Sequence, residues 1–504
     1  MPSYEPATPA TSSPSTKNKD PINLLRGWPH PSLLPTTLLA SAAQTALSDP
    51  SISTPGLLYG PDPGYGPLRE SLARWLSDFY HPDAGNGQEQ VTADRLCITG
   101  GASQNLGCVL SVYTDPTYTR CVWIVAPAYF LAFRIFEDAG LAMRAVPEDE
   151  DGVDIAFLRR EIEKIENEAQ DEGRDKPQLK DDRPWAKVYK HVIYCVPTFA
   201  NPSGKTMTLQ RRRELVGLAR EFDALVISDD VYDFLQWPSR SNPHPLKTAA
   251  LPRLVDIDRT LHHAKSSPST DHSFGNTCSN GSLSKLAGPG LRVGWCEGTS
   301  KFAFGVSQAG TTKSGGAPSQ LTSTYINILL ERGELQRHIS EVLCPAYARR
   351  YWEMMDAAAM ELVPLGFTLG KPGEVMNEAM RDVKGGYFTW LTLPRTLCVS
   401  AASHGIDAAE AFAERCLSDV NVNVAPGKLF EVPGSEMKFA ESIRLCWSWE
   451  EEEKIAEGVR RIARVAKAMT EEVEAGGIQK GYVLVNKSGG GAKRADVNDY
   501  ASYY

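Results

Sequence analysis

One lysine of this chain stands in a setting that favours a reactive amine. Lys285 follows Ser282 and Ser284 and precedes Arg292, with the kinked stretch 288–290 between them. A lysine must lose its proton to attack a carbonyl, and a nearby cation disfavours the ammonium form. An arginine beside hydroxyls also suits a phosphate group. A reactive amine next to a phosphate site indicates pyridoxal 5′-phosphate held as a Schiff base. The alternative is an ordinary lysine in a Gly/Pro loop.

Further polar side chains follow two apolar segments that are typical of strands. Asn201 comes shortly after one such run, and Asp229 and Tyr232 end the next. In parallel α/β sheets, ligands bind at the carboxyl ends of strands. A carboxylate at Asp229 can keep a pyridinium nitrogen protonated, and Tyr232 and Asn201 can hydrogen-bond the ring's phenolate oxygen. Asp230 is the rival carboxylate, although the spacing to Tyr232 favours Asp229.

In combination, three motifs resemble the class I/II aminotransferases, which are fold-type I pyridoxal phosphate enzymes. They are Asn201-Pro-Ser-Gly204, Asp229-x-x-Tyr232 and Ser282-x-Ser-Lys285-x-x-x-Pro-Gly-x-Arg-x-Gly294. The resemblance covers about residues 20–475 and is nearest to the branch of the 2-aminoadipate and kynurenine aminotransferases and their fungal relatives. It implies an α/β fold, in which helices flank a mostly parallel central sheet in a large domain. A smaller C-terminal α+β domain follows.

The resemblance also implies an activity. An amino group passes between an L-amino acid, 2-aminoadipate-like or aromatic, and a 2-oxo acid in two half-reactions. Lys285 forms the aldimine with the cofactor and then acts as general base on the substrate Cα proton. Arg444 grips the substrate α-carboxylate, and Gly27 and Asn201 lie beside the substrate. The alternatives are an edge-strand arginine for Arg444 and a simple turn glycine for Gly27.

The same resemblance assigns the cofactor phosphate to Ser282, Arg292, the backbone of Ala102 and the side chain of Ser103. Relatives often read G-S-Q-Q where this chain reads Gly101-Ala-Ser-Gln104. The alternative that Ser103 only caps a helix therefore stays open.

Two tyrosines complete the implied cofactor site. Tyr129 matches the aromatic that stacks on the cofactor ring, with a plain core tyrosine as the alternative. Tyr59 matches a tyrosine that reaches the phosphate of a neighbouring subunit, which implies a homodimer with shared active sites.

The chain divides into five predicted parts. Residues 1–20 are Pro/Ser/Thr-rich and read as a disordered arm. Residues 21–60 form a segment over the active site, 61–315 a large cofactor-binding domain, 316–476 a small domain, and 477–504 a flexible tail.

Two polar inserts and one helix stand out in the pattern. Residues 161–182 partly extend a helix, and residues 238–280 are expected as a long surface loop, both away from the chemistry. Ser448-Trp-Glu-Glu451 predicts a capping box. The apolar stripe of Ile455, Val459, Ile462, Ala466, Met469 and Val473 predicts the last helix, which Gly476 ends.

Composition narrows the possible partners. The net charge is −9 without a basic stripe, so nucleic acid is not expected. No run of about eighteen apolar residues predicts a membrane span, and no secretory signal opens the chain. Ten scattered cysteines indicate reduced core thiols and a cytoplasmic enzyme. The nine histidines have no metal-binding spacing.

Two other functions compete with transamination. A β-eliminating lyase of the cysteine-S-conjugate type would use the same cofactor residues. A non-catalytic, aminotransferase-like regulator is the remote alternative, because the N-terminal arm is too short for a helix-turn-helix.

Overall fold

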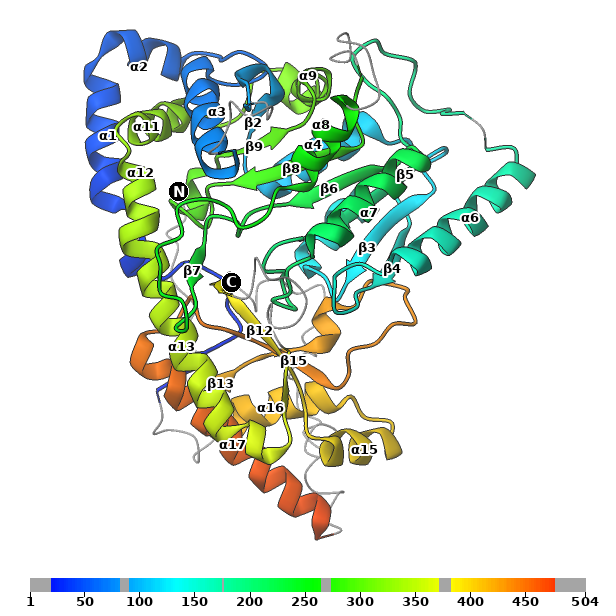
Figure 1. The fold of residues 1–504 in the computed structure, drawn as a ribbon, viewed down its shortest axis with the longest axis vertical. Helices are drawn as coiled ribbons and strands as arrows, with labels where there is room; N and C mark the ends of the chain where they lie inside the picture. The colour runs from blue at the N-terminus through cyan, green and yellow to red at the C-terminus, as the bar shows by residue number, and fades with distance from the viewer. Residues whose placement is uncertain (1–19, 82–89, 175, 264–272, 371–381, 476–504) are drawn as a thin grey trace, which may run out of the picture.

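The computed structural model describes residues 20–81, 90–174, 176–263, 273–370 and 382–475. The described chain forms a large α/β part, drawn at the top of Figure 1, and a smaller part built on a second sheet below it. The predicted disordered arm, except for its last residue, and the predicted tail lie outside the described residues.

A seven-stranded sheet forms the centre of the large part. β9 runs antiparallel to both of its neighbours, β2 and β8, and every other pair of neighbouring strands is parallel. Helices cover both faces, so β3, β5 and β6 read as almost continuous apolar runs. In order across the sheet, the strands are β2 (Leu96–Thr99), β9 (Gly294–Glu297), β8 (Thr277–Ser282), β6 (Leu225–Asp229), β5 (His191–Cys195), β3 (Cys121–Ala126) and β4 (Met143–Pro147).

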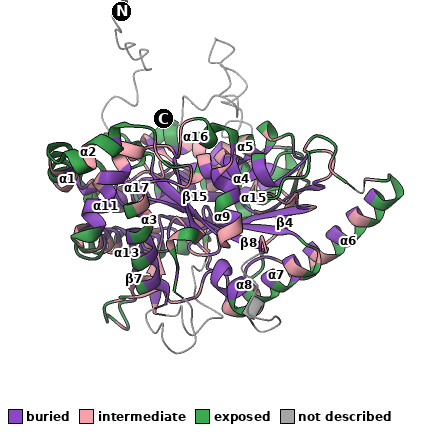
Figure 2. Cartoon of the chain, turned by 90° about the horizontal axis from the view of Figure 1, so that it is seen from above, coloured by how far each residue is buried: buried purple, intermediate pink, exposed green. Residues whose placement is uncertain are grey.

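Separate apolar cores lie on the two faces of this sheet, whose strands are largely buried in Figure 2. One core contains residues of α4 (Ala102–Tyr113), α5 (Phe133–Asp138) and α9 (Ser300–Ser307). The other contains residues of α6 (Ile155–Asp171), α7 (Leu209–Glu221) and α8 (Leu254–His263). The sheet is therefore the middle layer of three, as the sequence predicts for an α/β domain.

A group of helices extends the large part beyond β2. α11 (Gln320–Glu331) packs on α1 (Thr36–Ser48), α2 (Pro50–Leu57) and α3 (Gly66–Tyr80). The short α10 (Gly310–Lys313) precedes α11. α12 (Glu334–Arg337) and a π-helical turn, His338–Leu343, then lead into α13 (Cys344–Glu361), which runs down to the smaller part (Figure 1).

The smaller part is built on an antiparallel sheet. Its order is β10 (Thr368–Leu369), β12 (Phe388–Thr392), β15 (Ser442–Cys446) and β14 (Ala425–Pro426). α17 (Glu452–Glu474) packs against α13, α15 (Arg395–Ser403) and α16 (Ala408–Val420). The predicted apolar stripe of the last helix is buried from Ile455 to Met469.

The predicted capping box is wrong. The helix begins at Glu452 after Glu451, and no side chain caps it. The start lies too far along the chain for Ser448 to reach the first turn. The Ser448 hydroxyl instead donates to the carbonyl of Trp28 at 2.8 Å and so holds the N-terminal segment.

Two short strand pairs join distant parts of the chain. β1 (Ile22–Asn23) pairs in parallel with β13 (Val422–Asn423). β7 (Gln236–Pro238) pairs antiparallel with β11 (Val383–Gly385). The first pair fixes the N-terminal segment to the smaller part, and the second fixes the smaller part to the larger.

The second polar insert differs from its prediction as a surface loop. It contains α8 and most of β8, a strand buried along its whole length. Polar residues such as Thr277 and Ser279 concealed the strand, because a central strand can hide hydroxyls that find hydrogen-bond partners. The first insert does extend a helix, α6, and the Lys180 amine then donates to carbonyls at the end of α4.

Candidate functional site

A cavity of about 500 Å³ lies where the carboxyl ends of the parallel strands meet the N-terminal segment and the smaller sheet. Every site residue predicted from the sequence lines it, except Tyr59. A more open cavity of about 1290 Å³ beside α7 and α8 contains none of these residues. The predicted residues of the smaller cavity are Gly27, Ala102, Ser103, Tyr129, Asn201, Asp229, Tyr232, Ser282, Lys285, Arg292 and Arg444.

Lys285 follows the end of β8 and points its amine at the N-terminal segment. Its Nζ donates to the carbonyl of Gly27 at 2.7 Å. Burial and, to a lesser extent, the positive charge of Arg444 lower the pKa of Lys285 to about 8. The sequence pointed to Arg292 as the neighbouring cation, but that guanidinium is turned to the carbonyl of Gly100. The amine is therefore much easier to deprotonate than an exposed lysine.

Asp229 ends β6 and faces the same cavity. Its Oδ2 accepts a hydrogen bond from the Tyr194 hydroxyl at 2.7 Å, while its Oδ1 is buried without a partner among the described residues. Burial raises the pKa of Asp229 to about 6, and the Tyr194 bond opposes that rise. Asp230 points elsewhere and accepts from the hydroxyls of Ser228 and Ser279.

The start of α4 forms a corner suited to an anion. Ala102 and Ser103 are its first two residues, and backbone N–H groups at a helix start attract negative charge. Gly101 before them has φ +96°, and a Cβ there would lie 2.8 Å from Nη2 of Arg292. Glycine thus lets the guanidinium approach the helix start, with Ser282 lining the same cavity.

These features fit pyridoxal 5′-phosphate. The orphaned Oδ1 of Asp229 needs a donor, which a pyridinium N–H provides. The α4 corner with Arg292 and Ser282 suits a phosphate, and Lys285 supplies the amine for a Schiff base. The residues present could therefore hold the cofactor at its ring nitrogen, its phosphate and its carbonyl carbon.

Arg444 lies on β15, on the side of the smaller sheet that faces the cavity. Its Nη1 donates to Oδ1 of Asn201 at 2.8 Å, and its Nη2 donates to the carbonyl of Leu25. The guanidinium carbon lies 4.1 Å from the ring centre of Phe388 and 4.8 Å from that of Phe430. Burial lowers the pKa of Arg444 to about 10, so it stays charged at neutral pH. Both partners are uncharged, and no carboxylate among the described residues forms an ion pair with Arg444. The site is therefore suited to an incoming anion.

Several contributors escaped the sequence reasoning. Tyr194 lies inside a strand, and Phe388 and Phe430 are aromatic residues without a motif. Leu25 bonds Arg444 through its backbone carbonyl, which carries no side-chain signal. Gly27, by contrast, was named from the resemblance, and the structure gives a reason for glycine: a Cβ there would lie 2.7 Å from the Phe388 ring.

Tyr59 lies apart from the cavity, and its side chain is 91% exposed. Leu57 and Leu58 before it are also exposed. Its predicted role in a neighbouring subunit stays a prediction.

The described residues contain no cluster of three or more His, Cys, Asp or Glu side chains placed to hold a metal ion. Among the described helices, none is both long and apolar enough to cross a membrane. All ten cysteines are free thiols, and nine of them are buried.

Comparison with known proteins gives a consistent result. The family described as "Aminotransferase class I and II" matches residues 30–462. An uncharacterized protein of Saccharomyces cerevisiae is 35% identical over 462 residues, covering 89% of this chain and 97% of its own.

Two solved structures are also similar. The kynurenine aminotransferase of Pyrococcus horikoshii has a TM-score of 0.67 at 25% identity, covering 90% of this chain and 92% of its own. The α-aminoadipate aminotransferase LysN of Thermus thermophilus has a TM-score of 0.65 at 26% identity, covering 90% and 93%. The latter structure contains N-(5′-phosphopyridoxyl)-L-leucine.

Proposed function

Because this chain belongs to the class I and II aminotransferases, we propose that it moves the amino group of a 2-aminoadipate-like or aromatic L-amino acid to a 2-oxo acid. The family makes the chain a pyridoxal 5′-phosphate-dependent transaminase. The observation that carries the finer proposal is the meeting of Lys285, Asp229 and Arg444 in one cavity.

The cofactor would be held at three points. Asp229 would keep its ring nitrogen protonated, the α4 corner with Arg292 and Ser282 would bind its phosphate, and Tyr129 would lie against its ring. When bound, pyridoxal phosphate supplies a carbonyl carbon that accepts the amino group and a ring that withdraws electrons. The burial of Asp229 supports its proposed role as partner of the ring nitrogen, because low-dielectric surroundings strengthen the pairing of a carboxylate with a cation.

Lys285 would take the proton from the substrate Cα and then donate it to the cofactor carbon that had carried the carbonyl oxygen. A general base is most effective when its pKa lies near the working pH. The pKa of about 8 meets that requirement. The amine is bonded to the Gly27 carbonyl in the structure, so the substrate would have to displace it from that acceptor.

Arg444 would bind the substrate α-carboxylate with its planar fork of donors. The guanidinium packs on the rings of Phe388 and Phe430, and its hydrogen bond to Asn201 helps to set its orientation. This support leaves the charge of Arg444 available to any 2-amino or 2-oxo acid. Substrate choice then falls to the residues of the N-terminal segment.

A homodimer forms part of the proposal. Tyr59 is almost fully exposed, and the exposed Leu57 and Leu58 give it an apolar setting that suits contact with a second copy. In that arrangement Tyr59 would reach the phosphate end of its partner's cavity.

A product assay separates transfer from elimination. The purified protein is given pyridoxal phosphate, 2-oxoglutarate and either L-2-aminoadipate or L-kynurenine, and glutamate is measured. The proposal expects glutamate to form with at least one of these donors. If neither donor reacts, while a cysteine S-conjugate yields pyruvate and ammonia, the β-lyase alternative replaces it.

A further inference from the structure

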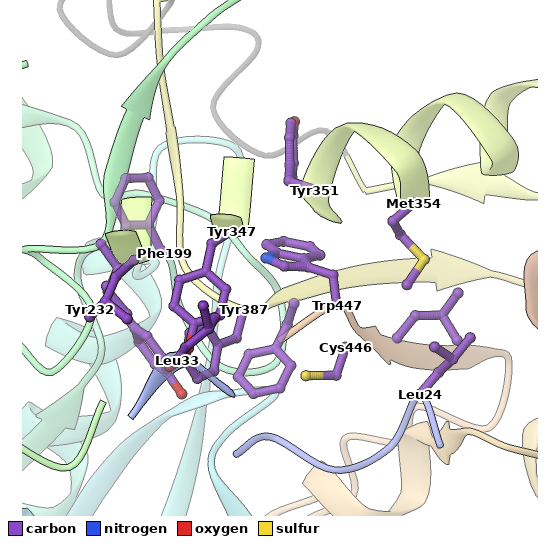
Figure 3. Close-up of a cluster of buried hydrophobic side chains, with 14 of the residues drawn as sticks. Leu24, Leu33, Phe199, Tyr232, Tyr347, Tyr351, Met354, Tyr387, Cys446 and Trp447 are labelled. Carbon is purple, nitrogen blue, oxygen red and sulfur yellow. Dashed lines mark hydrogen bonds between the residues drawn. The ribbon is translucent and has the colours of Figure 1, made fainter. Parts of the chain in front are cut away.

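A pair of buried tyrosines from the smaller part lies against Lys285. Tyr387 precedes β12, Tyr347 belongs to α13, and both are fully buried. Figure 3 shows them side by side, with Tyr232 of the cavity next to Tyr387. The Tyr387 hydroxyl lies 3.0 Å from that of Tyr347, and the Tyr232 and Tyr387 rings meet edge to face at 5.5 Å.

Tyr387 touches Lys285 at two places. Its hydroxyl shares its single proton between the Tyr347 hydroxyl at 3.0 Å and the backbone carbonyl of Lys285 at 3.4 Å. Its ring lies beneath the amine, with Nζ 5.4 Å from the ring centre. A cation within about 6 Å of an aromatic face is attracted by the ring, more strongly where water is excluded. The ring therefore acts on the proton of the reactive amine, and the hydroxyl acts on the backbone that carries it.

The charges around this amine make such support significant. Arg444 repels the ammonium, and burial removes its hydration. Asp229 is the carboxylate whose attraction opposes both effects, and it would be engaged by the cofactor ring nitrogen. Among the described neighbours, the Tyr387 ring is then a remaining source of attraction for a positive Lys285 nitrogen.

We propose that Tyr387 is a positioning residue for Lys285: its ring stabilises the positive amine, and its hydroxyl, joined to Tyr347, fixes the lysine backbone. The proposal rests on the role of Lys285 as the reactive amine of the proposed function.

The backbone of Tyr387 extends this role to the substrate end of the site. The Trp447 N–H donates to the Tyr387 carbonyl at 3.1 Å, and the Trp447 indole donates to Gly386, also at 3.1 Å. Trp447 follows β15, the strand that carries Arg444. Arg444, which would grip the substrate carboxylate, and Tyr387 are therefore joined through the β12–β15 pairing of one sheet. A shift of that sheet changes both together.

The test measures the proton affinity of Lys285 without measuring turnover. Full-length protein is stripped of cofactor, pyridoxal 5′-phosphate is added, and the rate of imine absorbance is followed from pH 6 to pH 10. Because only the neutral amine attacks, the pH at half-maximal rate reports the pKa of Lys285. Ionisations of the cofactor itself are common to all variants and cancel in the comparison.

Three variants separate the ring from the hydroxyl and from general packing. Tyr387→Met removes the ring but keeps apolar bulk, and the midpoint should fall by roughly 0.5–1 pH unit because the ammonium loses its cation–π partner. Tyr387→Phe should keep the midpoint and lower the plateau rate. Tyr351→Met alters a buried tyrosine that packs on Trp447 instead, and it should change neither.

An unchanged midpoint in Tyr387→Met, with a wild-type near-UV dichroism spectrum, would overturn the proposal. An equal fall in Tyr351→Met would also overturn it, because packing alone would then explain the effect. Should Tyr387→Met not fold, Tyr387→Leu takes its place with the same expectation. If wild-type protein captures no cofactor, the proposed function fails first, which is a different result.

Discussion

Lys285 must be neutral to attack and positive after it has taken a proton, and its surroundings make both forms accessible. Replacing it with alanine removes the amine but little apolar packing. We expect Lys285→Ala to lower the rate of amino transfer on the order of a thousandfold or more. Glutamate formation and the visible imine band measure this loss. Lys285→Arg, which keeps a cation but not the nucleophile, should be equally inactive, and transfer near the wild-type rate in either variant would contradict the assignment.

The adjacent pair of aspartates gives a matched comparison. Asp229→Asn should bind the cofactor but slow both half-reactions on the order of a hundredfold, because a neutral amide does not stabilise a protonated ring nitrogen. Asp230→Asn should leave the chemistry largely intact, since its side chain bonds Ser228 and Ser279 outside the cavity. Single-turnover spectra with an amino donor distinguish the two. The reverse result would mean that Asp230 is the partner of the ring.

Arg444 should act on every substrate alike, because each carries the same α-carboxylate. Arg444→Ala should cost roughly 2–5 kcal/mol in binding and raise KM for donor and acceptor together, since the carboxylate would be buried unpaired. Arg444→Lys should restore only part, because an ammonium lacks the planar fork. Cofactor absorbance serves as the control and should stay normal. A loss of cofactor binding with unchanged KM would place Arg444 at the wrong end of the site.

At the scale of elements, the N-terminal segment depends on Ser448, which the sequence pattern wrongly predicted to cap the last helix. The Ser448 hydroxyl holds the Trp28 carbonyl, and the Cys446 N–H donates to the Leu24 carbonyl at 2.8 Å. Ser448→Ala should cost about 1 kcal/mol locally and loosen the segment over the cavity. Hydrogen exchange of residues 24–30 should quicken while that of α17 stays unchanged. Faster exchange in α17 as well would mean that Ser448 does cap the helix.

The sequence was most informative where a side chain follows a strand. The ends of β6 and β8 could be predicted to meet at Asp229 and Lys285, because parallel strands finish at one edge of a sheet. The roles of Tyr194, Phe388 and Tyr387 could not be predicted, since they arise from contacts between segments far apart in the chain.

Local patterns failed for two other reasons. α8 was hidden in a stretch rich in Ser, Pro and His, although Leu254, Ile257 and Leu261 have helical spacing. Ser448 fitted a local motif, but its hydroxyl has a partner in the N-terminal segment that no local pattern reveals.

At the scale of the whole molecule, the buried amine makes folding depend on pH. The unfolded chain holds the Lys285 proton up to its ordinary pKa of 10.5, whereas the folded chain holds it only up to about 8. Between these values the unfolded state binds more protons, so the free energy of unfolding should rise with pH, by up to about 1.4 kcal/mol per unit. Urea unfolding of cofactor-free protein from pH 7.5 to 10 measures it. Lys285→Met should lack this part of the slope, and equal slopes would show that the amine is not depressed.

Association can be tested at the same scale. Sedimentation of the holoenzyme should give a dimer, and Leu58→Asp should weaken it, because a charge would then be buried at the proposed contact. Glu331→Asp, at the end of α11, is a conservative control away from Leu58. A fully active monomer at assay concentration would contradict the shared site.

The N-terminal segment has a property of a different kind. It meets Lys285 and Arg444 through the carbonyls of Gly27 and Leu25, and it is held to the smaller part through that of Trp28. Main-chain oxygens are present whatever residue occupies a position. We therefore expect that the side chains of Arg26 and Trp28, which line the cavity, can be exchanged in a library while the anchorage persists, whereas Leu25 also packs in a buried cluster with Phe430. Substitutions in this segment are therefore a direct way to change the substrate range, provided that Gly27 is kept.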